Sequence, residues 1–351
     1  MNSRLKRLHV ILKTNRLGGI IVSHQPNIAY LTEFASNDSY LLLASGKIHF
    51  ITDSRYYEQV RSALKGIDII LGGRPVFKTI ADLILSCKIK RIGFEARNLD
   101  FAQYRQIKKF SRPARLVPTH GLIEGLRKIK DSGELAKIKK AVNIAQEALR
   151  YVKQIIRPGL REIEIAAELE RFIRYKGART SSFEIIVASG KNSAFPHHLT
   201  SRKKLKKGEP VFVDIGGDYR GYKSDLTRVF FLGKIPSKVR KIYEIVRQAQ
   251  VLAIESIRPG INICEIDRRA RQYIAKYGYG GFFGHNLGHG IGLEVHEQPY
   301  ISPDSGAIIK EGMVFTVEPA IYLPGKFGIR IEDDVAVTKQ GCKVLSAALD
   351  K

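Results

Sequence analysis

Short apolar runs alternate with amphipathic stretches over the first 126 residues of the chain. The runs at residues 19–23, 40–43, 48–51 and 67–71 have the length and composition of β-strands, whereas residues 57–64 have the spacing of an amphipathic helix. This alternation predicts a compact α/β domain at residues 1–126.

The pattern changes near Leu126 to a long helical one. Ser132 is of a type that commonly caps a helix N-terminus, and Ile138, Ala141 and Leu149 follow it at helical spacing. We therefore predict a helix from about Ser132 and a second domain at residues 127–351.

The second domain contains an internal repeat. Residues 156–160, Ile-Arg-Pro-Gly-Leu, recur as residues 257–261, Ile-Arg-Pro-Gly-Ile, and residues 208–214 resemble residues 312–318. Each copy is predicted to form two helices followed by strands. The second domain is therefore expected to consist of two pseudo-symmetric α/β halves with a shared cleft.

A hairpin is predicted in the first half. Residues 211–215 and 223–232 have strand character, and a glycine-rich segment joins them. Closing this hairpin symmetrically about Tyr219 and Arg220 sets Asp214 directly opposite Asp225. Directly opposed side chains of an antiparallel pair lie about 5 Å apart on one face of the sheet.

The second half repeats the arrangement. Residues 314–317 and 329–337 are predicted strands, and closing the hairpin about Gly325 sets Glu318 opposite Glu332. Any one of these acids, taken alone, is expected on a surface balanced by Lys and Arg. Four of them duplicated at one cleft indicate a metal centre, because buried carboxylates are costly unless they are paired or bind metal.

A glycine-rich stretch at residues 284–292 contains His285 and His289, and His296 follows it. Spacing alone does not decide which imidazole binds metal. Oxygen-rich coordination with one imidazole favours Mn²⁺, with Co²⁺, Fe²⁺ and Zn²⁺ as alternatives. The number of carboxylates indicates two divalent ions rather than one.

Composition narrows the class of protein. The chain has 351 residues, 44% hydrophobic and 26% charged, and only three scattered cysteines, which argues against a secreted disulfide scaffold. The apolar runs near the N-terminus are too short for a signal peptide or a membrane span, so a cytoplasmic protein is expected. The net charge of +25 is spread along the chain, with one dense run at residues 202–207, and nucleic-acid binding is not favoured.

Four segments carry a family resemblance: VDIGGDYRGYKSDLTRVF at 213–230, GHGIGLEVHE at 288–297, MVFTVEPAIY at 313–322 and GIRIEDD at 328–334. They resemble the pita-bread metallopeptidases, the family of Xaa-Pro peptidases and methionine aminopeptidases. The resemblance extends over nearly the whole chain. It implies a pita-bread catalytic domain after a smaller α/β domain.

The resemblance also implies roles for individual residues. The implied metal ligands are Asp214, Asp225, His289, Glu318 and Glu332. His197, which follows a proline, and His296 are expected to contact the scissile carbonyl and stabilise its oxyanion, while the metals activate water. Glu318 is also expected to carry a proton to the leaving amine. His198 and His285 are expected only to orient their loops.

The first domain refines the expected activity. Residues 26–32 and 52–56 resemble the creatinase-like N-terminal domain of aminopeptidase P and prolidase, and the segment TDSRY at 52–56 favours aminopeptidase P. We therefore predict an Xaa-Pro aminopeptidase acting on proline-containing peptides, with an Xaa-Pro dipeptidase as the alternative. Glu33 departs from the family pattern, which more often has glycine there.

Two further alternatives differ in chemistry. A non-catalytic binding module would be expected to lack metal ligands, and all five are present. A creatinase-like hydrolase of a small amidine suits the intact ligand set less well. The resemblance further implies a homodimer, and no interaction with membranes is expected.

Overall fold

The computed structural model describes residues 3–44 and 46–349. Its contacts divide the chain into two compact units, with the break between Arg127 and Lys128.

Within residues 3–44 and 46–127, the first unit contains six strands and six helices. The strands are β1 (Gly19–Val22), β2 (Tyr40–Ala44), β3 (Lys47–Thr52), β4 (Asp68–Leu71), β5 (Arg91–Glu95) and β6 (Arg115–Thr119). The helices are α1 (Ser3–Thr14), α2 (Gln25–Thr32), α3 (Tyr57–Ala63), α4 (Val76–Ser86), α5 (Phe101–Phe110) and α6 (Leu122–Arg127). The four predicted strands and the predicted helix are confirmed as β1 to β4 and α3.

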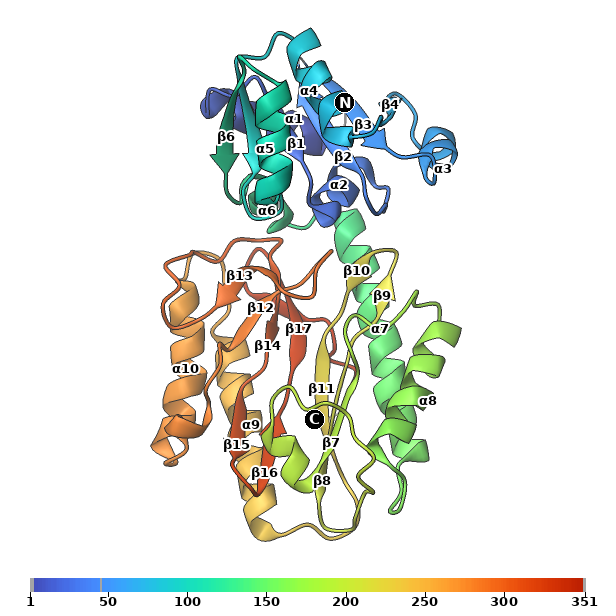
Figure 1. The fold of residues 1–351 in the computed structure, drawn as a ribbon. Coiled ribbons are helices and arrows are strands. Elements are labelled where there is room, and N and C mark those ends of the chain that lie inside the picture. The colour runs from blue at the N-terminus through green and yellow to red at the C-terminus, as the bar shows by residue number, and fades with distance from the viewer. Residues whose placement is uncertain (1–2, 45, 350–351) are drawn as a thin grey trace. The chain divides into compact units, whose positions relative to one another are not determined.

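These strands form one mixed sheet in the order β4-β3-β2-β1-β5-β6. Strand β1 is antiparallel to β2 and parallel to β5. Helices α4 and α5 cover the front of the sheet and α1 lies behind it (Figure 1). Apolar residues of the sheet and of α4 and α5, including Ile21, Leu42, Ile84 and Ile107, form the core between them.

Glu33 lies where α2 ends. Its backbone is left-handed, with φ of 59°, and its N–H donates to the carbonyl of Ala29. Glycine adopts this conformation without the Cβ clash that other residues suffer. The departure from the family pattern at Glu33 therefore affects a helix terminus, where the chain keeps the turn despite the strain.

The described part of the second unit, residues 128–349, contains four α-helices, two short 3₁₀ helices and twelve strands. The helices are α7 (Ser132–Ile155), α8 (Glu162–Tyr175), η1 (Gly190–Ala194), α9 (Ser237–Glu255), α10 (Ile263–Lys276) and η2 (Gly280–Phe282). The strands are β7 (Ile186–Ser189), β8 (Pro210–Ile215), β9 (Asp218–Tyr219), β10 (Tyr222–Lys223), β11 (Leu226–Phe231), β12 (Gly288–Gly290), β13 (Glu297–Ile301), β14 (Val314–Val317), β15 (Ala320–Leu323), β16 (Phe327–Arg330), β17 (Asp333–Val337) and β18 (Cys342–Val344).

Figure 1 shows the pair α7 and α8 and the pair α9 and α10 flanking these strands. The strands form the sheets β11-β8-β7 and β13-β12-β14-β17-β18 and the two-stranded pairs β10-β9 and β15-β16. Two buried apolar clusters fill the unit, one built largely around α7 and α8 and the other around α9 and α10.

The structure confirms the internal repeat. Gly159, between α7 and α8, and Gly260, between α9 and α10, both have φ of 92°. The N–H of Gly159 donates to the carbonyl of Leu205, and that of Gly260 to the carbonyl of Ile309. Both halves therefore use the same glycine turn at the same point of a helix pair.

The N-terminus of α7 differs by one residue from the prediction. Asp131, not Ser132, is the cap: its carboxylate accepts from the N–H of Glu134 at 2.8 Å, and the Glu134 side chain accepts from the N–H of Asp131 at 2.9 Å. This reciprocal capping box satisfies two backbone donors, which a cap at Ser132 would not.

The predicted register of the first hairpin is wrong by two residues. Asp214 pairs with Thr227 rather than with Asp225. The two-residue turn consists of Arg220 and Gly221, which both have positive φ, of 52° and 86°, as a type I′ turn requires. A shift of two residues keeps each side chain on its face, so Asp225 lies diagonally from Asp214 on the same side.

The predicted register of the second hairpin is confirmed. Val317 pairs with Asp333, and Ala320 pairs with Arg330. The single strand predicted at 329–337 is divided into β16 and β17, and the single strand predicted at 223–232 into β10 and β11. Each division falls beside a predicted metal ligand, Glu332 in the first case and Asp225 in the second, where the chain passes from one pair of hydrogen-bonded strands to the next.

Among residues 3–44 and 46–349, no helix combines the length and the apolar composition needed to cross a bilayer. The cysteines Cys87, Cys264 and Cys342 are all unpaired and half-buried.

Candidate metal centre

A cavity of about 400 Å³ opens in the second unit. All seven residues predicted from the sequence line it, namely Asp214, Asp225, His289, Glu318, Glu332, His197 and His296. His198 and His285 line it too. The structure therefore brings together every predicted site residue in one concave site.

The predicted ligands lie at or next to strand ends. Asp214 is in β8 and His289 in β12. Asp225 precedes β11, Glu318 follows β14 and Glu332 precedes β17. Pairing within and between the hairpins thus holds all five side chains on rigid backbone, and each is buried.

One group of three ligand-type atoms is compact. Single atoms of Asp225, His289 and Glu332 all lie within 4.8 Å of one another. His289 Nε2 lies 3.6 Å from Asp225 Oδ2 and 3.3 Å from Glu318 Oε1. His289 Nδ1 lies 3.2 Å from the carbonyl oxygen of Gly290, and a hydrogen bond there leaves Nε2 as the ligand atom.

Burial and mutual repulsion shift the pKa values of the acids in the site. Burial raises the pKa of Asp225 well above its ordinary value, and the charge of Glu332 raises it further. Burial also raises the pKa of Glu332, and Glu318 adds to the effect. At Glu318 burial acts in the same direction, but the hydrogen bond and charge of His289, together with the charges of Arg330 and His285, outweigh it and lower the pKa to about 2.

Several supporting residues were not assigned roles from the sequence. Arg330 is buried and forms an ion pair with Asp214. Its Nη1 donates to the Tyr322 hydroxyl at 3.0 Å, and its Nε donates to Thr227 Oγ1 at 3.1 Å. Thr227 Oγ1 in turn donates to Glu332 Oε2 at 2.6 Å. Arg330 stands within the GIRIEDD segment, but only the fold shows which acid it faces.

His198 and His285 have different partners. His285 Nε2 lies 3.3 Å from the Tyr322 hydroxyl, and His198 Nε2 lies 3.1 Å from a carboxylate oxygen of Glu162. Both contacts fit the predicted orienting role, although both imidazoles also line the cavity. Glu162 carried no sequence motif that would have singled it out.

The donor set fits a divalent metal. Oδ1 of Asp214 and Oδ1 of Asp225 are buried and have no hydrogen-bond partner within the described part of the chain. Unpaired buried oxygens beside two further carboxylates favour a cation. Four carboxylates with one imidazole are typical of Mn²⁺ or related ions.

Comparison with known proteins gives the family. A model of metallopeptidase family M24 matches residues 136–339, and one of the creatinase/prolidase N-terminal domain matches residues 4–129. The chain belongs to metallopeptidase family M24. This M24 protein therefore has the predicted combination of a creatinase-like N-terminal domain and a pita-bread domain, which confirms the resemblance and the fold class.

Relatives of this M24 protein include both predicted kinds of enzyme. It is 35% identical to the Xaa-Pro dipeptidase of Pyrococcus horikoshii, over 99% of this chain and 97% of that one. A solved Xaa-Pro dipeptidase from Bacillus anthracis has a TM-score of 0.95 and 38% identity, covering 99% of this chain and 98% of that one. A solved X-Pro aminopeptidase from Thermotoga maritima has a TM-score of 0.89 and 36% identity, covering 97% of both chains.

Proposed function

We propose that this M24 protein is an Xaa-Pro dipeptidase that uses two divalent metal ions, with Mn²⁺ favoured. The observation that carries the proposal is one cavity that brings together the four predicted ligand carboxylates with His289, His197 and His296, in a chain whose relatives include Xaa-Pro dipeptidases. The cavity of about 400 Å³ is at the small end of ligand sites, which suits a dipeptide. These findings favour the alternative drawn from the sequence over the aminopeptidase.

In this proposal Asp214, Asp225, His289, Glu318 and Glu332 hold the ions. Bound there, divalent ions would act as Lewis acids on the scissile carbonyl and activate water for attack. The buried carboxylates would hold their positions through the contacts of Arg330 and Thr227, so little reorganisation is needed when substrate binds.

The remaining steps belong to side chains at the cavity. His197 and His296 would donate hydrogen bonds to the oxyanion that forms on the carbonyl. The His296 ring lies 4.2 Å from the ring of His289, beside the predicted centre. Glu318 would move a proton from water to the leaving amine, which needs a carboxylate within reach of both.

An Xaa-Pro aminopeptidase is the second candidate, supported by the likeness to the Thermotoga maritima enzyme and by the TDSRY segment at 52–56. The two activities differ in whether the substrate continues beyond proline. The homodimer implied by the resemblance stays a prediction.

The test uses full-length protein freed of metal and then supplied with Mn²⁺. We expect metal-dependent hydrolysis of an Xaa-Pro dipeptide, with much slower release of the N-terminal residue from an Xaa-Pro-Xaa tripeptide. An Asp225→Asn variant controls for contaminating peptidases. Faster cleavage of the tripeptide would support the aminopeptidase instead, and no cleavage of either peptide with any divalent metal would refute both.

A further inference from the structure

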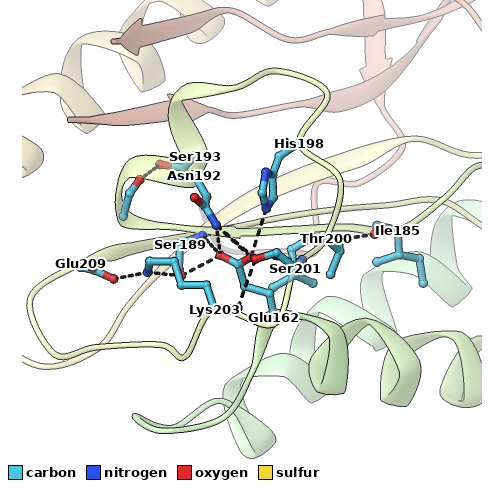
Figure 2. Close-up of polar contacts among 12 residues, drawn as sticks. Glu162, Ile185, Ser189, Asn192, Ser193, His198, Thr200, Ser201, Lys203 and Glu209 are labelled. Carbon is cyan, nitrogen blue, oxygen red and sulfur yellow. Dashed lines mark hydrogen bonds and ion pairs between the residues drawn. The ribbon is translucent and has the colours of Figure 1, made fainter. Parts of the chain in front are cut away.

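Glu162 is a buried carboxylate with no part in the proposed chemistry. It is the first residue of α8, and none of it is exposed to solvent. Its side-chain partners lie in residues 189–201, named here the histidine loop because the segment contains His197 and His198. Figure 2 shows the Glu162 carboxylate surrounded by side chains of this loop.

Both carboxylate oxygens of Glu162 accept hydrogen bonds from the histidine loop. Oε1 accepts from the Ser189 N–H at 2.7 Å and from the Ser189 hydroxyl at 2.8 Å. Oε2 accepts from the Ser201 hydroxyl at 2.6 Å. Asn192 Nδ2 lies 3.2 Å and 3.1 Å from the two oxygens, and His198 Nε2 lies 3.1 Å from Oε2. Glu162 therefore joins both ends and the middle of the loop.

The ionised form of Glu162 suits this arrangement. Burial acts to raise its pKa, but the hydrogen bonds from Ser201, Ser189 and His198 together outweigh burial and lower the pKa below its ordinary value. A carboxylate accepts hydrogen bonds at both oxygens, whereas the amide of glutamine would set an NH₂ group against donors at one of them. Glutamine at this position is therefore nearly isosteric but poorly matched to its partners.

The two neighbours of His197 are both anchored. The carbonyl of Pro196 accepts from Arg330 Nη1 at 3.3 Å, and the His198 imidazole contacts Glu162. Apolar packing contributes little here, because Phe195 is 60% exposed and Leu199 is 75% exposed. The orientation of His197 in the cavity therefore depends on polar anchors, and Glu162 supplies the one on its C-terminal side.

We propose that Glu162 is a positioning residue for the peptidase reaction, and that it acts by holding the histidine loop so that His197 faces the scissile carbonyl. The proposal rests on the proposed function, in which His197 stabilises the oxyanion. A displacement of about 1 Å at a catalytic group can lower the rate by about 100-fold, so a residue outside the cavity can have a large effect.

The kinetic test compares Glu162→Gln in two backgrounds, using Mn²⁺-loaded full-length enzyme and an Xaa-Pro dipeptide. In the wild-type background we expect kcat/KM to fall by about 10- to 100-fold. In a His197→Ala background the same change should lower kcat/KM by less than about 3-fold, because a group that acts through His197 has nothing left to position. Equal losses in both backgrounds would overturn the proposal.

Glu134→Gln is the matched control. Glu134 is also buried in the second unit, where it accepts from the Tyr222 hydroxyl at 3.0 Å, and it does not line the cavity. Its variant should lose thermal stability to a similar degree but keep the wild-type kcat/KM. A Glu162→Gln enzyme no less active than the Glu134→Gln enzyme would also overturn the proposal.

A second measurement needs no substrate. Amide hydrogen exchange of peptides covering residues 189–201 should be faster in Glu162→Gln than in wild type and Glu134→Gln. Unchanged exchange in this loop would overturn the positioning role. If the wild-type enzyme cleaves no Xaa-Pro peptide, the proposed function fails, and the exchange result still decides whether Glu162 orders the histidine loop.

Discussion

Lys130 and Glu297 form a buried ion pair in the second unit. Lys130 Nζ lies 2.9 Å from Glu297 Oε1, and the two side chains are only 1% and 5% exposed. A Lys130→Met substitution keeps an unbranched apolar chain of similar length but removes the charge. The change leaves the Glu297 carboxylate in a dry environment without its cation.

The size of the effect follows from the distance and from proton uptake. At 2.9 Å and an effective dielectric constant of about 20, the Coulomb attraction is about 6 kcal/mol. The loss should be smaller, because the Glu297 carboxyl can take up a proton once the Lys130 charge is removed. For a carboxyl with an ordinary pKa of about 4.3, that uptake costs about 3.7 kcal/mol at pH 7 and about 1 kcal/mol at pH 5.

We therefore expect Lys130→Met to lower the free energy of unfolding by about 3 to 4 kcal/mol at pH 7, within the range for breaking a buried pair. The cost of proton uptake by Glu297 is absent below about pH 4.3. It grows as the pH rises, because the native variant must hold a proton that the unfolded chain releases. For a unit of this size the change corresponds to a Tm lower by about 6 to 16 °C.

The change in Tm is measured by thermal unfolding followed by far-UV circular dichroism, since the chain has no tryptophan for fluorescence. The control is Arg247→Met, which breaks a pair with Glu244 of nearly equal length, 2.8 Å, whose side chains are 39% and 51% exposed. That loss should stay below about 1 kcal/mol. The double variant Lys130→Met/Glu297→Met should recover most of the stability. A loss below about 1 kcal/mol at pH 7, or an equal loss at pH 5, would show that this ion pair does not stabilise the unit in the way proposed.

Three further predictions concern the site and α7. Thr227→Val removes the hydroxyl that donates to Glu332, and it should weaken Mn²⁺ binding by about 10- to 100-fold in calorimetric titration; unchanged affinity would contradict this. Glu318→Gln should abolish peptide turnover, and retained kcat would reject the proton-transfer role. Asp131→Ala should cost about 1 kcal/mol in denaturant unfolding, whereas Ser132→Ala should change stability little; the reverse order would contradict the observed cap.

Much of the fold could be predicted from the sequence alone. The repeated Ile-Arg-Pro-Gly turn predicted two similar halves, and short apolar runs predicted β1 to β4. The second hairpin was predicted in its correct register because Gly325 marks the turn. These features are local, because turn chemistry and side-chain periodicity act over a few neighbouring residues.

The first hairpin shows where local reasoning fails. Arginine seldom adopts positive φ, so the sequence did not indicate a turn made of Arg220 and Gly221. The acids Asp214 and Asp225 still share a face, because a shift of two residues preserves the alternation of side chains. The prediction of a shared site therefore survives an error in the exact pairing.

The contacts that support the site residues could be seen only in the folded structure. Arg330 meets Asp214 across 116 positions of sequence, and Glu162 meets His198 across 36. The sequence predicted the four acids of the proposed metal centre, because carboxylates in repeated strand patterns are visible residue by residue, whereas His289 was expected only from the family resemblance. Which buried group holds each of them depends on how separate strands, helices and loops pack, because such contacts form only where the folded chain brings distant segments together.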